Sequence, residues 1–219
     1  MGYKAVIFDL DGTLLDTIGD LADSMNAVLE RNRFAVHPVQ RYKFFVGDGM
    51  KNLALRALPE AARGEDTILR IAAEMEREYG SNWDNKTVPY EGIIDTLVRL
   101  AEMKVKLNVL SNKPHKFTTI MVEKYFKGVK FEYVIGASDT FNKKPDPAAA
   151  LYIASGLGIP ASGFIYAGDT DTDMATARNA KMFAAGVSWG FRPVSELISA
   201  GADKIIQNPR ELLNFFENA

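Results

Sequence analysis

Short apolar runs recur along the chain and alternate with stretches of helical periodicity. Six runs are apolar over most of their length, as expected of strands that are covered on both faces. They lie at residues 3–9, 105–110, 131–135, 164–167, 182–187 and 204–206. Between the later runs, apolar residues recur at helical spacing; Ile93, Leu97 and Leu100 are one example. This alternation predicts an α/β fold, a mostly parallel sheet with helices on both faces.

Residues 16–87 interrupt the alternation, because they contain no convincing strand and follow helical spacing. Their clearest amphipathic stripe consists of Ile68, Ile71, Ala72, Met75 and Tyr79. An all-helical segment inserted directly after the first strand predicts a separate lid or cap. We therefore expect two domains, a core of residues 1–15 and 88–219 and a small all-α cap of residues 16–87.

Composition and charge narrow the class of protein. The 219 residues suffice for one large domain, or for a core with a smaller insert. A hydrophobic fraction of 47% and a formal net charge of -2 are ordinary for a globular protein and give no basic footprint for nucleic acid. The chain has no cysteine, and His37 and His115 are too few for a histidine-based metal cage. Because an acidic motif begins at Asp9 and no apolar run approaches about 20 residues, we expect a cytoplasmic protein with no membrane partner.

The first predicted strand opens into the turn Asp9-Leu10-Asp11-Gly12-Thr13. Gly12 lets the backbone bend sharply, and Thr13 offers a hydroxyl and a backbone N–H to an anion. A carboxylate nucleophile beside a second carboxyl indicates phosphoryl transfer through an aspartyl phosphate on Asp9. Asp11 is then predicted to be the general acid for the leaving alkoxide and the base for the attacking water. Taken alone, the pattern is equally consistent with a turn or a helix N-cap.

Residues that suit the same chemistry follow other predicted strands. In an open parallel sheet, ligands bind at the carboxyl ends of the strands. Ser111 and Asn112 offer hydrogen bonds to phosphate oxygens, and Lys144 offers positive charge to a phosphate that faces several aspartates. Taken alone, the Ser-Asn pair is more often a helix cap than a ligand, and a lone lysine is more often a solvated surface charge. For Lys113 the sequence is equally consistent with phosphate binding and with a solvated charge.

The carboxylates at the strand ends predict a magnesium site. This ion prefers oxygen ligands, and Asp169 can complete a site with Asp9 and a backbone carbonyl. We assign Asp9, Asp11 and Asp169 to the metal. An EF-hand loop that starts at Asp169 is the alternative, and it fails because Met174 and Ala180 stand where glycine and glutamate are required.

Four segments together resemble the motifs of the haloacid dehalogenase-like hydrolases. They are Asp9–Thr17, Ser111-Asn112, Lys144-Pro145 and Gly168–Asp173. The resemblance covers essentially the whole chain and implies a Rossmann-like core, a small α-helical cap, dependence on Mg²⁺ and a phospho-aspartyl intermediate on Asp9. It also implies that Lys144, rather than Lys143, is the lysine of the third motif, because the family lysine directly precedes the proline.

Within this family the chain is most similar to the phosphoglycolate phosphatases, in the cap segment Phe45–Met50 and in its C-terminal third. Gly47 and Gly49 can expose backbone N–H groups to a small anionic substrate, or they only shape a turn; both interpretations stay open. The implied activity is hydrolysis of a small phosphomonoester, with 2-phosphoglycolate as the first choice. The alternatives are a β-phosphoglucomutase-like sugar-phosphate mutase and a pyrophosphatase or nucleotidase of the same family.

The expected partner is a small phosphorylated metabolite, and the chain is expected to be a monomer or a homodimer. A dehalogenase is disfavoured, because it needs no metal and two of the predicted aspartates would have no purpose. A non-catalytic module is disfavoured because every catalytic position is filled. Asp173 is open between contact with metal-bound water and no such contact, and Trp189 and Phe191 are predicted to pack at the edge of the core.

Overall fold

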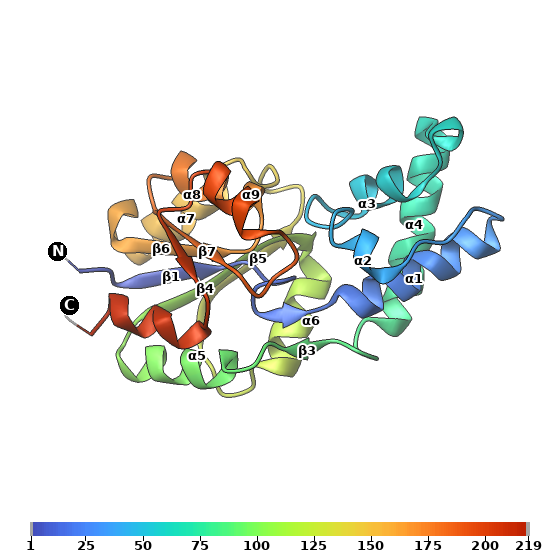
Figure 1. The fold of residues 1–219 in the computed structure, drawn as a ribbon. Helices are drawn as coiled ribbons and strands as arrows, with labels where there is room; N and C mark the ends of the chain where they lie inside the picture. The colour runs from blue at the N-terminus through green and yellow to red at the C-terminus, as the bar shows by residue number, and fades with distance from the viewer. Residues whose placement is uncertain (1, 218–219) are drawn as a thin grey trace. The chain divides into compact units, whose positions relative to one another are not determined.

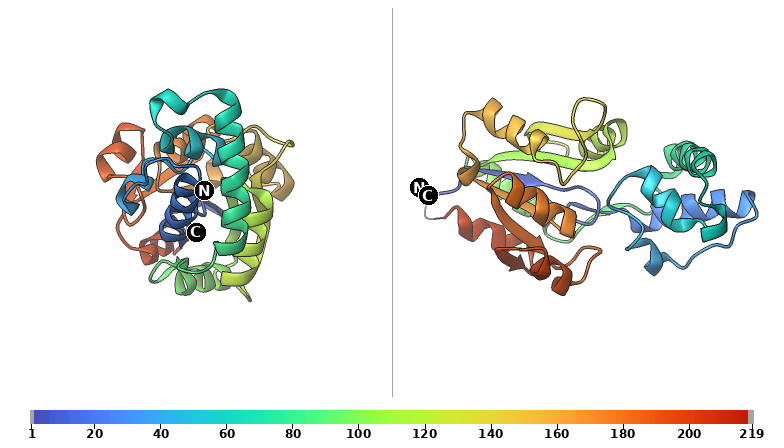
Figure 2. Two further views of the ribbon diagram at one scale, coloured as in Figure 1. Left: turned by 90° about the vertical axis from the view of Figure 1, so that its right-hand side faces the viewer. Right: turned by 90° about the horizontal axis from the view of Figure 1, so that it is seen from above.

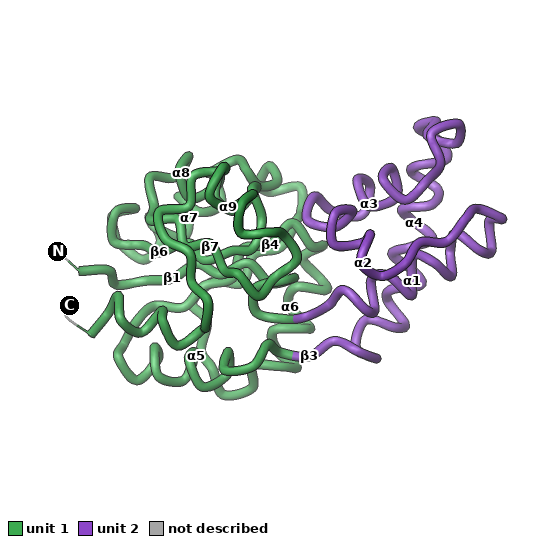
Figure 3. The backbone as a smooth tube through the Cα atoms, viewed as in Figure 1, with its two compact units in different colours: residues 1–15, 89–219 green, residues 16–88 purple. Residues whose placement is uncertain are grey.

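The computed structural model describes residues 2–217 and contains two compact units (Figures 1 and 3). Unit 1 comprises residues 1–15 and 89–219, and unit 2 comprises residues 16–88. The chain leaves unit 1 at strand β2 (Leu15–Asp16) and returns at β3 (Val88–Pro89), and these short strands pair with each other. That unit 1 is a core domain and unit 2 its cap domain stays a prediction.

Unit 1 is built on a six-stranded parallel sheet of order β5-β4-β1-β6-β7-β8. Its strands are β1 (Ala5–Phe8), β4 (Lys106–Pro114), β5 (Phe131–Ala137), β6 (Phe164–Gly168), β7 (Phe183–Val187) and β8 (Lys204–Ile206). The buried strand β1 lies in the middle, where Val6 pairs with Leu107 of β4 and with Ile165 of β6. Each strand overlaps one of the predicted apolar runs, so the predicted α/β fold is confirmed.

Helices cover both faces of this sheet (Figures 1 and 2). Those of unit 1 are α5 (Ile93–Glu102), α6 (His115–Tyr125), α7 (Ala148–Leu157), α8 (Asp171–Asn179) and α9 (Val194–Ser199), with short 3₁₀ segments η2 (Ala161–Gly163) and η3 (Pro209–Phe215). On one face, Ile153 of α7 and Met174 of α8 share a buried cluster with Ile7 of β1. Helix α5 and segment η3 lie on the other face. Within residues 2–217, every helix is too short or too polar to cross a membrane.

Strand β4 extends beyond its predicted end. The apolar pattern ends at Leu110, whereas the strand continues to Pro114. Backbone pairing with β5 resumes after a register shift, with Pro114 opposite Ala137. Ser111 and Asn112 therefore lie in an irregular strand end and not in a loop, because the backbone pairing outlasts the apolar side chains.

Unit 2 is helical. Its elements are α1 (Ile18–Arg31), α2 (Val39–Tyr42), α3 (Met50–Ala57), η1 (Glu60–Ala62) and α4 (Glu65–Asn82). Helix α4 packs against α1 and α3. Ile71, Met75 and Tyr79 are fully buried on the packed face of α4, as the amphipathic stripe predicts. The predicted all-α insert after the first strand of the sheet is confirmed.

A buried carboxylate joins the beginning of unit 2 to its end. Asp20, in the first turn of α1, is 1% exposed. Its oxygens accept hydrogen bonds from the N–H of Lys86 at 2.9 and 3.0 Å and from the N–H of Thr87 at 2.9 Å. The hydroxyl of Thr87 donates a further bond at 2.8 Å. Fixed neutral donors thus surround this carboxylate.

Candidate active site

The chain turns sharply directly after β1. The carbonyl of Leu10 accepts a hydrogen bond from the N–H of Thr13 (3.3 Å), and the side chain of Asp9 accepts one from the N–H of Leu10 (2.7 Å). Gly12 has a φ of +84°, and a Cβ at this position would lie 2.2 Å from Oδ2 of Asp169. Both the backbone conformation and the close approach of that carboxylate therefore require glycine.

Three buried carboxylates meet at this edge of the sheet. One oxygen from each of Asp9, Asp169 and Asp173 lies within 4.8 Å of the other two. Asp9 follows β1, Asp169 follows β6, and Asp173 lies in the first turn of α8. A capping box places Asp173, whose carboxylate accepts a bond from the N–H of Thr170 at 3.1 Å. The cluster provides the oxygen ligands that Mg²⁺ prefers.

Lys144 introduces a positive charge into this cluster from the loop after β5. Its Nζ lies 2.7 Å from Oδ1 of Asp173 and 3.0 Å from Oδ1 of Asp9. Asn112 holds the lysine by its backbone: the N–H of Lys144 donates to Oδ1 of Asn112 (2.8 Å), and Nδ2 of Asn112 donates to the carbonyl of Lys144 (3.2 Å). The Asn112 amide thus positions the backbone of Lys144. Contact of Asn112 with a substrate stays a prediction.

The concentration of buried charge shifts the pKa values of these groups. Burial raises the pKa of Asp9 to about 7; Lys144 opposes this rise, whereas Asp173 and Asp11 add to it. Burial, together with Asp173 and Asp9, also holds the pKa of Asp169 well above its usual range. Burial by itself would lower the pKa of Lys144, but the carboxylates of Asp173 and Asp9 outweigh it and raise the value. The excess negative charge favours a further cation.

Asp11 lies outside the three-carboxylate cluster. Its two oxygens lie 3.0 and 3.2 Å from Nζ of Lys113, whose side chain is only 1% exposed. This buried ion pair rules out the interpretation of Lys113 as a solvated charge. The predicted contribution of Asp11 to a metal site stays a prediction.

The loop after β7 supports the same edge of the sheet. The N–H of Phe191 donates to Oδ2 of Asp169 (2.8 Å), and Oγ1 of Thr13 donates to Oδ1 of that carboxylate (3.0 Å). Nε1 of Trp189 in turn donates to the carbonyl of Thr13 (3.0 Å). The sequence predicts packing roles for Trp189 and Phe191 and misses these polar contacts. Their signal is that both residues follow an apolar strand of the sheet.

The remaining predicted site residues lie in different units. Ser111 is 4% exposed at the end of β4, and its Oγ accepts a bond from the N–H of Lys113 (3.3 Å). Gly47 and Gly49 belong to unit 2 and have φ values of +115° and +86°, in the left-handed region that favours glycine. Their contact with substrate stays a prediction.

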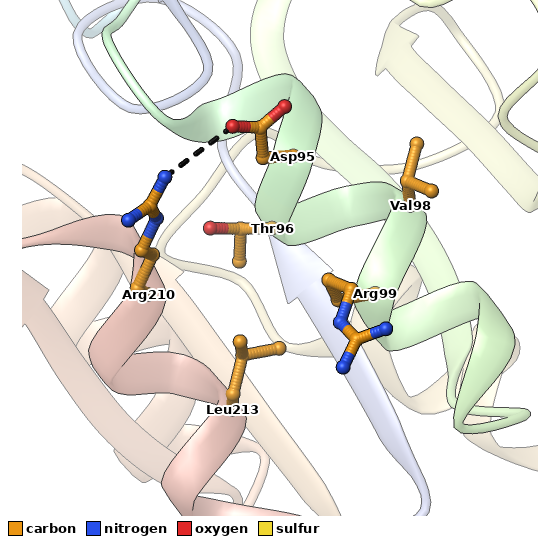
Figure 4. Close-up of a pocket in the computed structure, with 6 residues that line it drawn as sticks. All are labelled: Asp95, Thr96, Val98, Arg99, Arg210 and Leu213. Carbon is orange, nitrogen blue, oxygen red and sulfur yellow. Dashed lines mark hydrogen bonds and ion pairs between the residues drawn. The ribbon is translucent and has the colours of Figure 1, made fainter.

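A separate hollow of about 430 Å³ lies between α5 and η3 of unit 1 (Figure 4). It is lined by Asp95, Thr96, Val98, Arg99, Arg210 and Leu213. Figure 4 shows the ion pair between Asp95 and Arg210, whose side chains are 3.5 Å apart and mostly exposed. An exposed pair of this kind contributes little energy, so the strand ends stay the stronger candidate for chemistry.

Comparison with known proteins identifies the family. A family model described as "Haloacid dehalogenase-like hydrolase" matches residues 6–187. The chain belongs to this family of hydrolases. The resemblance predicted from the four motifs is therefore confirmed.

Individual relatives of this haloacid dehalogenase-like hydrolase carry a more specific name. The chain is 32% identical over 207 residues to a phosphoglycolate phosphatase of Pseudomonas syringae pv. tomato, covering 88% of this chain and 73% of the relative. It is 32% identical over 222 residues to a phosphoglycolate phosphatase of Psychrobacter arcticus, covering 99% of this chain and 94% of the relative. A crystal structure from Lactobacillus delbrueckii subsp. bulgaricus, whose protein has a provisional assignment as a phosphoglycolate phosphatase, matches with a TM-score of 0.91 and 32% identity over 97% of both chains.

Proposed function

We propose that this hydrolase is a magnesium-dependent phosphatase that cleaves a small phosphomonoester through an aspartyl phosphate on Asp9. The observation that carries the proposal is the buried cluster of Asp9, Asp169 and Asp173, with Nζ of Lys144 within 3.0 Å of two of them. A nucleophile, a fixed positive charge and metal-binding oxygens are the parts that phosphoryl transfer requires.

The proposed reaction has two steps. In the first, a carboxylate oxygen of Asp9 attacks phosphorus, the ester P–O bond breaks, and the leaving oxygen takes a proton from Asp11. In the second, water attacks the phosphorus of the aspartyl phosphate and gives a proton to Asp11. The bond between phosphorus and the Asp9 oxygen then breaks, so that inorganic phosphate leaves and both carboxyl groups return to their initial states.

The neighbouring polar residues are proposed to bind the phosphate directly or through the groups that they hold. Lys144 offsets negative charge on the transferring phosphoryl group, and the hydroxyl of Ser111 binds one of its oxygens. Thr13 bonds to Asp169 and Asn112 to the backbone of Lys144. We assign both to the substrate site through these contacts, because a displacement of about 1 Å can cost a factor of about 100 in rate.

Magnesium fits this site through the chemistry of its donor atoms. Asp9, Asp11 and Asp169 are proposed to hold the ion together with a backbone carbonyl, and Asp173 lies beside Asp9 and Asp169. Burial, and after it the charge of the neighbouring carboxylates, raises the pKa values of Asp9 and Asp169, and a divalent cation would offset that negative charge. When bound, the ion supplies positive charge that stabilises the phosphoryl group during transfer.

The proposed substrate is 2-phosphoglycolate. The relatives in Pseudomonas syringae pv. tomato and Psychrobacter arcticus are named phosphoglycolate phosphatases, and the second aligns with 99% of this chain. Gly47 and Gly49 are proposed to present backbone N–H groups of the cap to the small anion. A cytoplasmic location and a monomeric or homodimeric state complete the proposal.

The test measures release of inorganic phosphate with Mg²⁺ from 2-phosphoglycolate, sugar phosphates, nucleotides and pyrophosphate. We expect 2-phosphoglycolate to have the highest kcat/KM. A higher kcat/KM for pyrophosphate or a nucleotide would overturn the assignment of 2-phosphoglycolate as the substrate. Phosphoryl transfer that depends on a sugar bisphosphate would indicate a mutase. Asp9→Asn is expected to abolish release, whereas Asp171→Asn, at an exposed carboxyl in α8, retains it. Unchanged release by Asp9→Asn would overturn the mechanism.

A further inference from the structure

Two buried lysines pair with different acidic groups at the strand ends. Lys144 lies against Asp9 and Asp173, on the side of the nucleophile and the proposed metal. Lys113 lies against Asp11, with Nζ at 3.0 and 3.2 Å from its two oxygens. The proposed chemistry uses the first lysine and gives no task to the second.

The backbone of Lys113 is held from several sides. Its N–H donates to Oγ of Ser111 (3.3 Å), and its carbonyl accepts a bond from Oγ1 of Thr118 in α6 (3.2 Å). On the β5 side, a Cβ at Gly136 would lie 2.8 Å from the Lys113 carbonyl oxygen, so the two strands are in close contact. The lysine therefore extends from a fixed point of β4 to the turn after β1.

We propose that Lys113 is a positioning residue for Asp11, holding its carboxyl group where it delivers a proton to the leaving oxygen. This role rests on the proposed function, in which Asp11 is the general acid. The side chain of Asp11 is 17% exposed, whereas that of Lys113 is 1% exposed, so the buried lysine anchors the more accessible group.

The lysine can hold Asp11 in both states that the proposed reaction requires. An ionised carboxylate accepts hydrogen bonds at both oxygens, and a protonated carboxyl keeps its carbonyl oxygen as an acceptor. An N–H of Lys113 bound to that oxygen leaves the O–H of Asp11 directed at the substrate. Loss of this contact frees the carboxyl to rotate, and proton transfer depends on its alignment.

The dependence of rate on the leaving group tests this role. An alkoxide needs a proton as it leaves, whereas 4-nitrophenolate is stable enough to leave without one. Lys113→Met is therefore expected to lower kcat/KM about 100-fold for 2-phosphoglycolate and less than about 3-fold for 4-nitrophenyl phosphate. Lys113→Arg, which keeps a charged donor, should restore part of the loss. Lys106→Met removes an exposed, ion-paired lysine from the same strand and should leave both rates unchanged.

A double-mutant cycle separates positioning from a general structural effect. If Lys113 acts through Asp11, Lys113→Met should add no further loss in an Asp11→Asn background. Equal losses for both substrates, additive losses in the cycle, or no loss at all would overturn the role. Lys113→Gln replaces the methionine variant if the latter does not fold, and the same outcomes apply.

The wild-type protein separates this inference from the proposed function. Phosphate release that is absent, or that survives Asp9→Asn, overturns the proposed function and the role of Lys113 with it. Release that depends on Asp9 but shows no leaving-group selectivity in Lys113→Met overturns the positioning role alone.

Discussion

Asp9 in unit 1 and Asp20 in unit 2 are both buried carboxylates, at 5% and 1% exposure, yet their surroundings differ in kind. Asp20 accepts hydrogen bonds from the backbone N–H groups of Lys86 and Thr87 and from a hydroxyl. Asp9 shares its surroundings with other carboxylates and one lysine, and burial raises its pKa to about 7.

The comparison shows that burial alone does not distinguish a structural carboxylate from a reactive one. Neutral donors fixed by the backbone satisfy Asp20 and join the two ends of unit 2, so its charge stabilises the fold. At Asp9 the nearby charges do not balance, and a bound cation would offset the excess negative charge. The difference lies in what surrounds each carboxylate.

The largest expected difference between the two positions is in catalysis. Asp9→Asn should lower kcat for phosphate release at least about 1,000-fold, which corresponds to about 4 kcal/mol, because it removes the proposed nucleophile. Asp20→Asn keeps an acceptor oxygen and should stay within about 3-fold of the wild type well below the melting temperature. Steady-state kinetics with Mg²⁺ measure both, and comparable losses in the two variants would break the comparison.

The next effect is on stability and has the opposite pattern. Asp20→Ala leaves buried N–H groups of Lys86 and Thr87 without their acceptor, and should lower the free energy of unfolding by about 3 kcal/mol. Asp23→Ala is the matched control, because Asp23 also pairs with Lys86 but is half exposed; it should cost less than about 1 kcal/mol. Urea unfolding measures both, and equal costs would contradict the structural role of Asp20.

A smaller effect on stability should appear at Asp9 in the metal-free protein. Here the substitution Asp9→Asn should increase the free energy of unfolding relative to the wild type as the pH rises, whereas Asp20→Ala lowers it. A carboxyl whose pKa rises from 3.8 to about 7 on folding binds its proton more tightly when folded, so the stability it contributes at low pH is lost as the pH rises toward 7. Asp9→Asn has no such loss. The free energy of unfolding of Asp9→Asn relative to the wild type should therefore increase by about 2 kcal/mol between pH 5 and pH 8. The measurements are made with a chelator present. A difference in the free energy of unfolding between the two proteins that does not change with pH would contradict the raised pKa of Asp9.

The smallest expected effect is that of magnesium on the folded protein. An ion present at about ten times its Kd stabilises the state that binds it by about 1.4 kcal/mol, and raises the melting temperature accordingly. Asp169→Asn should remove most of this shift, whereas Asp20→Asn should keep it. An equal shift in all three proteins would place the ion outside the strand-end cluster.

Much of the fold follows from local patterns in the sequence. Mostly apolar runs predict all six strands of the sheet, because both faces of such strands are covered by other elements. The rule that ligands bind at the carboxyl ends of parallel strands then selects Asp9, Ser111 and Asp169 before any contact is known. The end of β4 at Pro114 escapes this approach, since backbone pairing there continues beyond the apolar pattern.

The sequence by itself determined the α/β core, the helical insert and the residues with chemistry to offer. Only the tertiary structure decided which of those residues meet. Lys113 and Asp11 are 102 positions apart, and nothing in the local pattern distinguishes a lysine that is solvated from one that another strand end covers. The local pattern likewise does not predict that Asp173 lies beside Asp9 and Asp169. Burial and charge pairing belong to the packed chain, because they depend on distances that only folding sets.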